Sequence, residues 1–72
     1  MYNKIRDLRE DNDMKQTELA RYLNCSQQAY SYYELGKRSV PSDVLIKLAD
    51  LYRTNIDFIL GLTRNKTYYK DL

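Results

Sequence analysis

The chain has 72 residues, of which 43% are apolar and 31% are charged, and its formal net charge is +2. This length allows one domain with a small core, and the composition is that of a globular chain rather than a disordered one. The sequence contains no apolar run long enough to cross a membrane, and residues 1–15 lack the apolar stretch of a secretory signal, so we expect a cytoplasmic protein with no membrane partner.

The residue types that are missing exclude several kinds of site. The chain has no His and a single Cys, Cys25, so it offers no tetrahedral zinc site, no Ser-His-Asp triad and no intrachain disulfide. Its two glycines, Gly36 and Gly61, lie too far apart for a phosphate-binding loop. A closed pocket that perturbs the pKa of a carboxylate needs more chain than this. We therefore expect no enzyme, no metal, no cofactor and no small-molecule ligand.

Apolar spacing and helix-capping residues predict an all-α chain, beginning with three short helices. The first is expected over residues 3–10 and the second over residues 16–23. The third is expected over Gln27–Leu35, because Ser26 is a good N-cap and Gly36 is the glycine that commonly follows a helix. A short basic loop then leads to Pro41.

Two more helices and a tail are expected after this loop. Ser42 is expected to cap a fourth helix that extends to Tyr52, and Asn55 a fifth over residues 56–60. Residues 62–72 are mostly polar and have no apolar period, so we predict a domain of residues 1–61 followed by a polar tail of residues 62–72. We expect the tail tyrosines, Tyr68 and Tyr69, to be loose rather than to make a dimer contact. Four other tyrosines are expected to supply core bulk: Tyr22, Tyr30, Tyr33 and Tyr52.

The second and third helices have the spacing of a helix-turn-helix. Each is about two turns long, and three or four residues join them. Ala20 is small enough to allow the two helices to cross closely, and Asn24 tolerates the left-handed conformation that the turn requires. The residues that would form their shared core are Leu19, Leu23, Cys25, Tyr30 and Tyr33.

The outward face of the third helix is uncharged and rich in hydrogen-bonding groups: Gln27, Gln28, Ser31 and Tyr32. The side-chain amide of Gln can pair with adenine in the major groove through its N–H and its carbonyl oxygen. The Ser hydroxyl can bind either a hydrogen-bond donor or an acceptor on a base edge. The alternative is that these are ordinary solvated side chains. Within a helix-turn-helix we favour contact with DNA bases.

Candidates for contact with DNA phosphates lie at the start of the second helix and in the loop after the third. Gln16 lies in the first turn of the second helix, where backbone N–H groups attract phosphate. Lys37, Arg38 and Ser39 follow the third helix and can reach the DNA backbone beside the groove. The alternative for Lys37 and Arg38 is that they are simply solvated, as basic loop residues usually are.

Several motifs in this order resemble the Cro/phage-repressor type of helix-turn-helix domain. The motifs are IRDLRE at 5–10, QTELA at 16–20, YELGKRSVPS at 33–42, LIKLADLY at 45–52 and NIDFILG at 55–61. The resemblance implies a lambda-repressor-like domain of five helices that reads double-stranded DNA with its third helix, usually as a two-fold dimer on a palindrome. It also implies a buried ion pair between Arg9 and Glu34.

We therefore expect a sequence-specific transcriptional regulator, acting as a repressor by occupying its operator. The low net charge means that one monomer binds weakly, so we expect a homodimer, with Phe58 and Leu62 at the fifth helix as exposed contacts. The alternative is a protein-interaction module, such as an antitoxin-like partner or an anti-regulator that reuses the fold. With little chain after the fifth helix, we expect no attached ligand-sensing domain.

Overall fold

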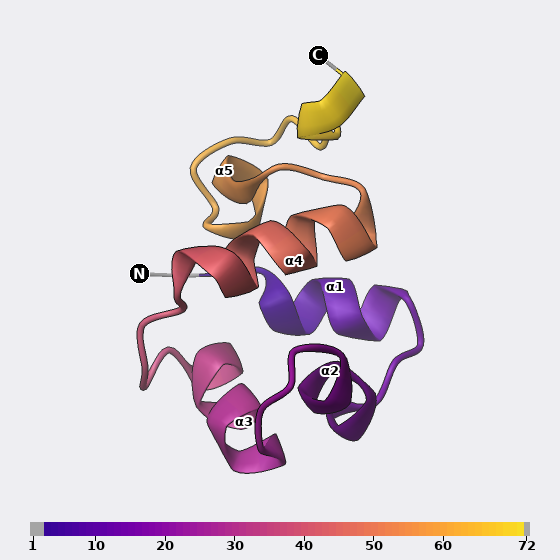
Figure 1. Cartoon of the computed structure of the whole chain (residues 1–72). Helices are drawn as coiled ribbons and strands as arrows, with labels where there is room; N and C mark the ends of the chain where they lie inside the picture. Colours follow the sequence, from indigo (N-terminus) through magenta and orange to yellow (C-terminus); the bar gives the residue numbers. More distant parts are fainter. Residues whose placement is uncertain (1–2, 72) are drawn as a thin grey trace.

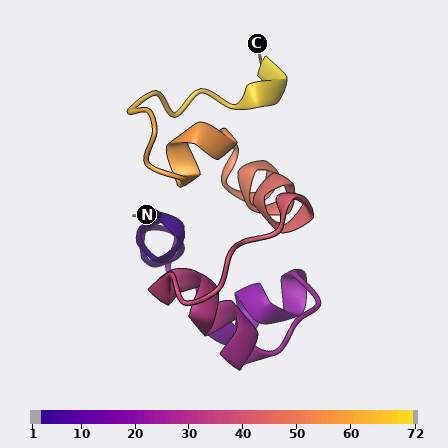
Figure 2. The same cartoon turned by 90° about the vertical axis from the view of Figure 1, so that its left-hand side faces the viewer.

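The helices form two groups with the first helix between them. The structure, a computed structural model, describes residues 3–71. Helices α2 and α3 form one end, and α4 and α5 lie toward the other, with α1 in between (Figures 1 and 2). The elements are α1 Ile5–Asp11, α2 Gln16–Tyr22, α3 Gln27–Leu35, α4 Ser42–Tyr52, α5 Ile56–Ile59 and a short 3₁₀ helix, η1, Tyr69–Asp71. Residues 3–71 contain no strand, so the predicted all-α fold of five α-helices is confirmed.

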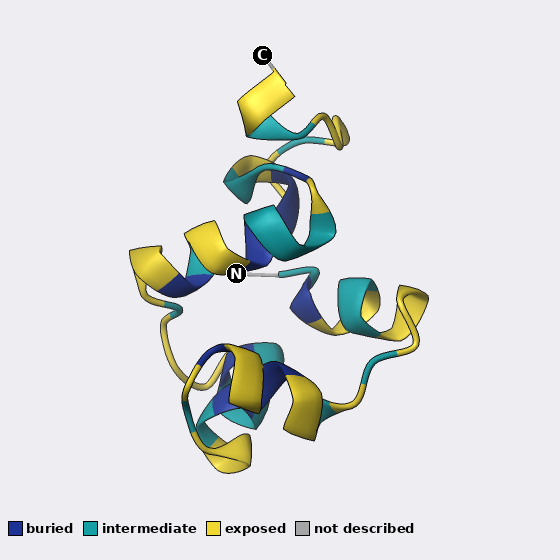
Figure 3. Ribbon diagram, turned by 45° about the vertical axis from the view of Figure 1, so that its right-hand side comes forward, coloured by how far each residue is buried: buried dark blue, intermediate teal, exposed yellow. Residues whose placement is uncertain are grey.

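One apolar cluster between the two groups receives residues from all five α-helices. Its buried members are Ile5, Leu19, Ala20, Leu23, Tyr30, Tyr33, Val44, Leu48, Ala49 and Ile59. The buried segments face inward and the exposed ones face outward (Figure 3). Tyr22 was also expected in the core, and this is wrong: it is 43% exposed, and its hydroxyl donates a hydrogen bond to the carbonyl of Lys47 at 3.2 Å.

Local capping chemistry explains the bounds of α3. The Ser26 hydroxyl accepts a hydrogen bond from the backbone N–H of Ala29 at 3.1 Å, which satisfies one of the free donors of the first turn. Gly36 ends the helix with φ +72°, a left-handed conformation that glycine adopts without steric cost. Asn24 has φ +58°, as predicted for the turn before α3. Ser42 does not cap α4: it is the first helical residue, and Pro41 occupies the N-cap position.

The tail is packed against α4 and α5, so the expectation of loose tyrosines is wrong. The Asp50 carboxylate on α4 accepts hydrogen bonds from the hydroxyls of Tyr68 at 2.8 Å and Tyr69 at 2.7 Å. The side-chain amide of Asn55 donates to two tail carbonyl oxygens at 2.9 and 2.8 Å. The division into residues 1–61 and 62–72 stays a prediction, and residues 1, 2 and 72 lie outside the described residues.

The fifth helix does not expose Phe58, which corrects one of the two predicted dimer contacts. Phe58 is 5% exposed, and the ammonium groups of Lys4 and Lys66 lie 4.7 and 5.5 Å from its ring centroid. In α5, Phe58 and Ile59 are buried, whereas Ile56 is half-buried. Leu62, which follows this helix, is 67% exposed as expected.

Candidate nucleic-acid interface

Helices α2 and α3 form a compact two-helix unit. Four residues, 23–26, connect them, and the left-handed Asn24 makes this connection tight enough to turn the chain. The backbone N–H of Cys25 donates to the carbonyl of Ala20 at 2.9 Å, which ties the turn to α2. Ala20 is 4% exposed, consistent with a close approach of the two helices, and Tyr30 from α3 is fully buried. The geometry is that of a helix-turn-helix.

A polar cluster fixes α3 to the two helices before it. The Arg9 guanidinium on α1 donates from Nε to Glu34 Oε2 at 2.6 Å and from Nη2 to Glu34 Oε1 at 3.3 Å. Gln16 on α2 donates from its amide nitrogen to Glu34 Oε1 at 3.0 Å, and Arg9 also donates to the carbonyl of Met14 at 3.0 Å. The Glu34 side chain is only 3% exposed. One carboxylate thus connects α1, α2 and α3, including the ion pair that the resemblance implied.

The charge state of Glu34 follows from this cluster. Burial by itself raises the pKa of a carboxyl group, but the hydrogen bonds from Arg9 and Gln16 outweigh burial and hold the pKa of Glu34 below its ordinary value. Glu34 is therefore ionised at neutral pH and paired with a charged Arg9.

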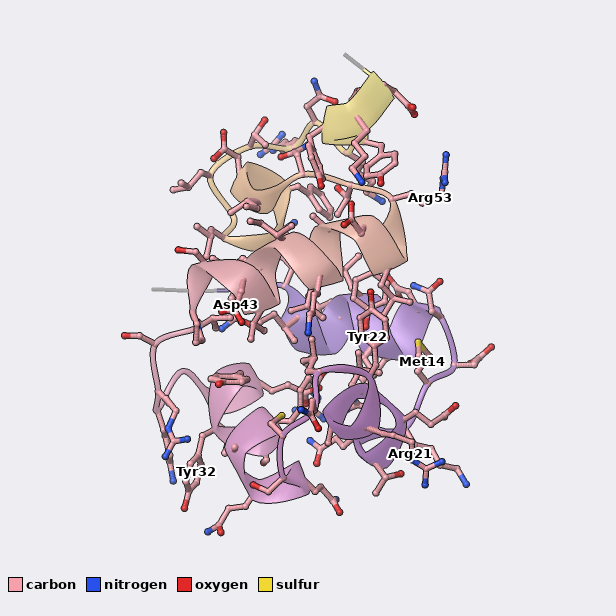
Figure 4. The ribbon with its side chains drawn as sticks, viewed as in Figure 1. Met14, Arg21, Tyr22, Tyr32, Asp43 and Arg53 are labelled. Carbon is pink, nitrogen blue, oxygen red and sulfur yellow. The ribbon has the colours of Figure 1, made fainter. Side chains whose placement is uncertain are left out.

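The outer face of α3 carries the four predicted base-contacting residues. Gln27 and Gln28 are exposed, and Ser31 and Tyr32 are half-buried. Tyr32 lies on the side of α3 away from α2 in the view of Figure 4. The Gln28 amide nitrogen donates to the Tyr32 hydroxyl at 2.9 Å, so these two side chains are joined on the helix surface.

The basic loop after α3 lies beside this face. Lys37, Arg38 and Ser39 are all exposed, and the guanidinium carbon of Arg38 is 5.8 Å from the centroid of the Tyr32 ring. The structure therefore brings the loop and α3 together through one cation–π contact. Gln16 is placed differently, because it is half-buried and its side-chain amide donates a hydrogen bond to Glu34.

Sequence reasoning missed two features of this region. The first is the joining of Gln28 to Tyr32, although a spacing of four residues on one helix face would have indicated it. The second is Met14, whose backbone carbonyl accepts from Arg9. No side-chain pattern marks a backbone acceptor, so the sequence carried no signal for it.

A two-helix unit with a polar outer face on its second helix is typical of helix-turn-helix domains. Comparison of the sequence with known families identifies the same class. The profile of the helix-turn-helix family matches residues 5–59, and the chain belongs to this family, in its Cro/phage-repressor type. The profile covers all five α-helices, so the family accounts for the whole described fold apart from the tail.

Two curated relatives come from Bacillus subtilis (strain 168). An uncharacterized HTH-type transcriptional regulator, YobD, is 35% identical over 60 residues, covering 83% of this chain and 54% of the relative. The HTH-type transcriptional regulator ImmR is 33% identical over 58 residues, covering 81% of this chain and 46% of the relative. The chain thus spans about half the length of both, and their names describe transcriptional regulators rather than enzymes.

Two other kinds of feature are absent from residues 3–71. No helix in this range has both the length and the apolar character needed to cross a bilayer. The same residues contain no group of three or more Cys, Asp or Glu side chains arranged to hold a metal ion.

Proposed function

We propose that the chain is a sequence-specific DNA-binding domain that inserts α3 into the major groove and acts as a transcriptional repressor by occupying its operator. The observation that carries this proposal is the outer face of α3, which is uncharged and dense in hydrogen-bonding groups. The C-terminal end of this helix is fixed to α1 and α2 through Glu34. Major-groove base edges are read by such donors and acceptors. A helix held by α1 and α2 offers them in a constant orientation.

The residues divide into two roles in this proposal. Those that read bases are Gln27, Gln28, Ser31 and Tyr32. Those that hold the phosphate backbone are Gln16, Lys37, Arg38 and Ser39. Phosphate contacts set the position of the protein and contribute affinity, whereas contacts to base edges distinguish one sequence from another.

A two-fold dimer on a palindrome completes the proposal. The net charge of +2 supplies little electrostatic affinity for a single copy, and two α3 helices about 34 Å apart would read half-sites one turn of DNA apart. For the contact between the copies we propose the end of the molecule that carries the exposed Leu62.

A protein-interaction module is the second candidate, and one observation favours it. Leu35 at the end of α3 is 59% exposed, which would suit an apolar contact with a protein partner. The exposed loop of Lys37, Arg38 and Ser39 beside α3 favours DNA instead, because a basic loop in that place suits phosphate.

Selection of bound duplexes from a pool of random-sequence DNA separates the two candidates. The purified protein is expected to enrich one palindromic sequence. If no sequence is enriched at low salt and micromolar protein, DNA recognition is excluded and the interaction module becomes the function to test.

A further inference from the structure

Gln28 and Tyr32 are joined before any DNA is present. The amide nitrogen of Gln28 donates to the Tyr32 hydroxyl at 2.9 Å, across one turn of α3. Gln28 is exposed and Tyr32 is half-buried, so the tyrosine ring is the better fixed of the two. A free glutamine on a helix surface samples many rotamers, and this hydrogen bond restricts them.

The bond leaves free the groups that adenine requires. A glutamine amide has two N–H donors and one carbonyl oxygen, and Tyr32 takes one of the donors. Pairing with N7 and N6 of adenine in the major groove uses the carbonyl oxygen and the N–H on the same side of the amide, so Tyr32 must take the opposite N–H. The hydrogen bond to Tyr32 therefore restrains Gln28 without consuming its capacity to read a base.

Arg38 also contacts the tyrosine. Its guanidinium carbon lies 5.8 Å from the centroid of the Tyr32 ring, within the range of a cation–π attraction. Arg38 comes from the loop after α3, so the ring contacts this loop as well as Gln28 on its own helix. A guanidinium placed against a ring still has N–H donors directed elsewhere, which leaves it able to bind a phosphate.

We infer that Tyr32 is a positioning residue for Gln28, and that Arg38, Tyr32 and Gln28 form one pre-arranged unit that reads an adenine through Gln28. This inference rests on the proposed DNA-binding function, but it replaces the base contact proposed above for Tyr32 with an action of Tyr32 on Gln28. Because fixing a flexible side chain in advance removes part of the entropic cost of binding, Tyr32→Phe is expected to weaken specific binding about threefold to tenfold.

The free protein provides the first test. The Gln28 side-chain amide is observed by nuclear magnetic resonance in the whole chain and in Tyr32→Phe, with Tyr22→Phe as the matched control. Tyr22→Phe also removes a tyrosine hydroxyl, but one that donates to the backbone carbonyl of Lys47. The inference requires that the Gln28 amide resonances shift and become more mobile in Tyr32→Phe alone. Unchanged resonances in that variant would overturn it.

A double-mutant cycle on DNA provides the second test. The affinities of the wild type, Gln28→Ala, Tyr32→Phe and the double variant are measured on the duplex that the wild type selects. The loss caused by Tyr32→Phe should disappear in the Gln28→Ala background. Gln28→Ala should also relax specificity at one base pair. When the adenine there is replaced by 7-deazaadenine, which lacks the N7 acceptor, the loss of affinity caused by Tyr32→Phe should become smaller.

The outcomes separate this inference from the function on which it rests. A loss of the same size in both backgrounds shows that Tyr32 touches DNA by itself and overturns the inference alone. The inference alone is also overturned if the base at which Gln28→Ala relaxes specificity is not an adenine. Failure of the wild type to select any duplex removes the proposed function and the inference together.

Discussion

Glu34 ties α3 to the two helices that precede it. Its carboxylate accepts hydrogen bonds from Arg9 on α1 and from Gln16 on α2 while its side chain is only 3% exposed. Removing one partner from a buried ion pair leaves the other charge without compensation, which typically costs about 3–5 kcal/mol. This is a large share of the roughly 5–15 kcal/mol by which small domains are stable.

Acid should destabilise the protein through Glu34. The pKa of Glu34 is lower in the folded state than its ordinary value of 4.5, so below about pH 4.5 the unfolded chain takes up the proton first. The stabilisation is complete above that pH and is lost as the pH falls through the folded-state pKa. Urea unfolding between pH 7 and pH 3 measures it.

In Glu34→Gln the stability at pH 7 should fall and the acid dependence should become shallower. Glu10→Gln is the matched control, since Glu10 forms an exposed pair with Arg6 at 3.4 Å and should change stability at pH 7 by less than about 1 kcal/mol. An unaltered acid dependence in Glu34→Gln would rule out this role for the carboxylate.

Tyr52 should destabilise the protein in alkali. Burial, together with the nearby Glu34 carboxylate, raises the pKa of Tyr52 to about 12, from an ordinary value of 10.0. Above about pH 10 the unfolded state loses this proton more readily, so stability present below pH 10 is lost as the pH rises toward 12. The Tyr52 hydroxyl also has no hydrogen-bond partner among the described residues.

Tyr52→Phe should therefore be neutral or stabilising at pH 7 and should lose less stability at about pH 11 than the wild type. Urea unfolding at both pH values measures this, with Tyr22→Phe as a variant that removes a hydrogen-bonded hydroxyl instead. A variant that is clearly destabilised at pH 7 would show that the hydroxyl has a stabilising partner.

At the scale of the elements, the sequence predicted the positions of the helices well but did not predict that the tail packs against α4 and α5. The bounds of α3 follow from Ser26 and Gly36, which act within one turn of the helix they limit. The tail is held by contacts between residues 18 and 19 positions apart, from Tyr68 and Tyr69 to Asp50. No local pattern indicates which distant carboxylate two tyrosines will find. The burial of Phe58 was missed for a similar reason, since a one-turn helix has no apolar period that identifies its inner face.

The tail should detach from α4 when its acceptor is removed. Asp50 receives both tyrosine hydroxyls and lies 3.5 Å from the ammonium of Lys70. In Asp50→Ala, cleavage by trypsin after Lys66 and Lys70 should become several-fold faster, while α1 to α3 remain protected. Asp43→Ala removes the same group from the exposed start of the same helix and serves as the control. Equal cleavage rates in the two variants would contradict a tail held by Asp50.

At the scale of the whole molecule, we propose that two copies act together as a homodimer. Leu62→Glu places a charge at the proposed contact and should weaken both self-association and binding to the selected palindrome by about tenfold or more. Analytical ultracentrifugation with and without the duplex measures the association. Leu35→Glu, which alters the exposed end of α3, should leave self-association without DNA unchanged. A wild-type chain that stays monomeric at high concentration, with and without DNA, would exclude the dimer.

The family and the fold could be predicted from the sequence because the motifs lie between residues 5 and 61, and the family profile matches residues 5–59. The candidate site was predicted less completely. The residues on the outer face of α3 follow from helical periodicity, but the hydrogen bond between two of them depends on side-chain conformation. The operator itself is a property of the complex and leaves no mark on the sequence of the protein alone.

Comparison of Gln28→Ala with Lys37→Ala tests most directly the claim that α3 reads bases while the loop holds phosphates. Affinity is measured for both variants on the selected duplex and on an unrelated one, over a range of salt concentrations. Gln28→Ala should cost about 1–3 kcal/mol on the selected duplex only, and Lys37→Ala should weaken binding to both and reduce the salt slope by about one unit. If the two variants lose the same affinity on both duplexes with the same salt slope, α3 does not read the sequence.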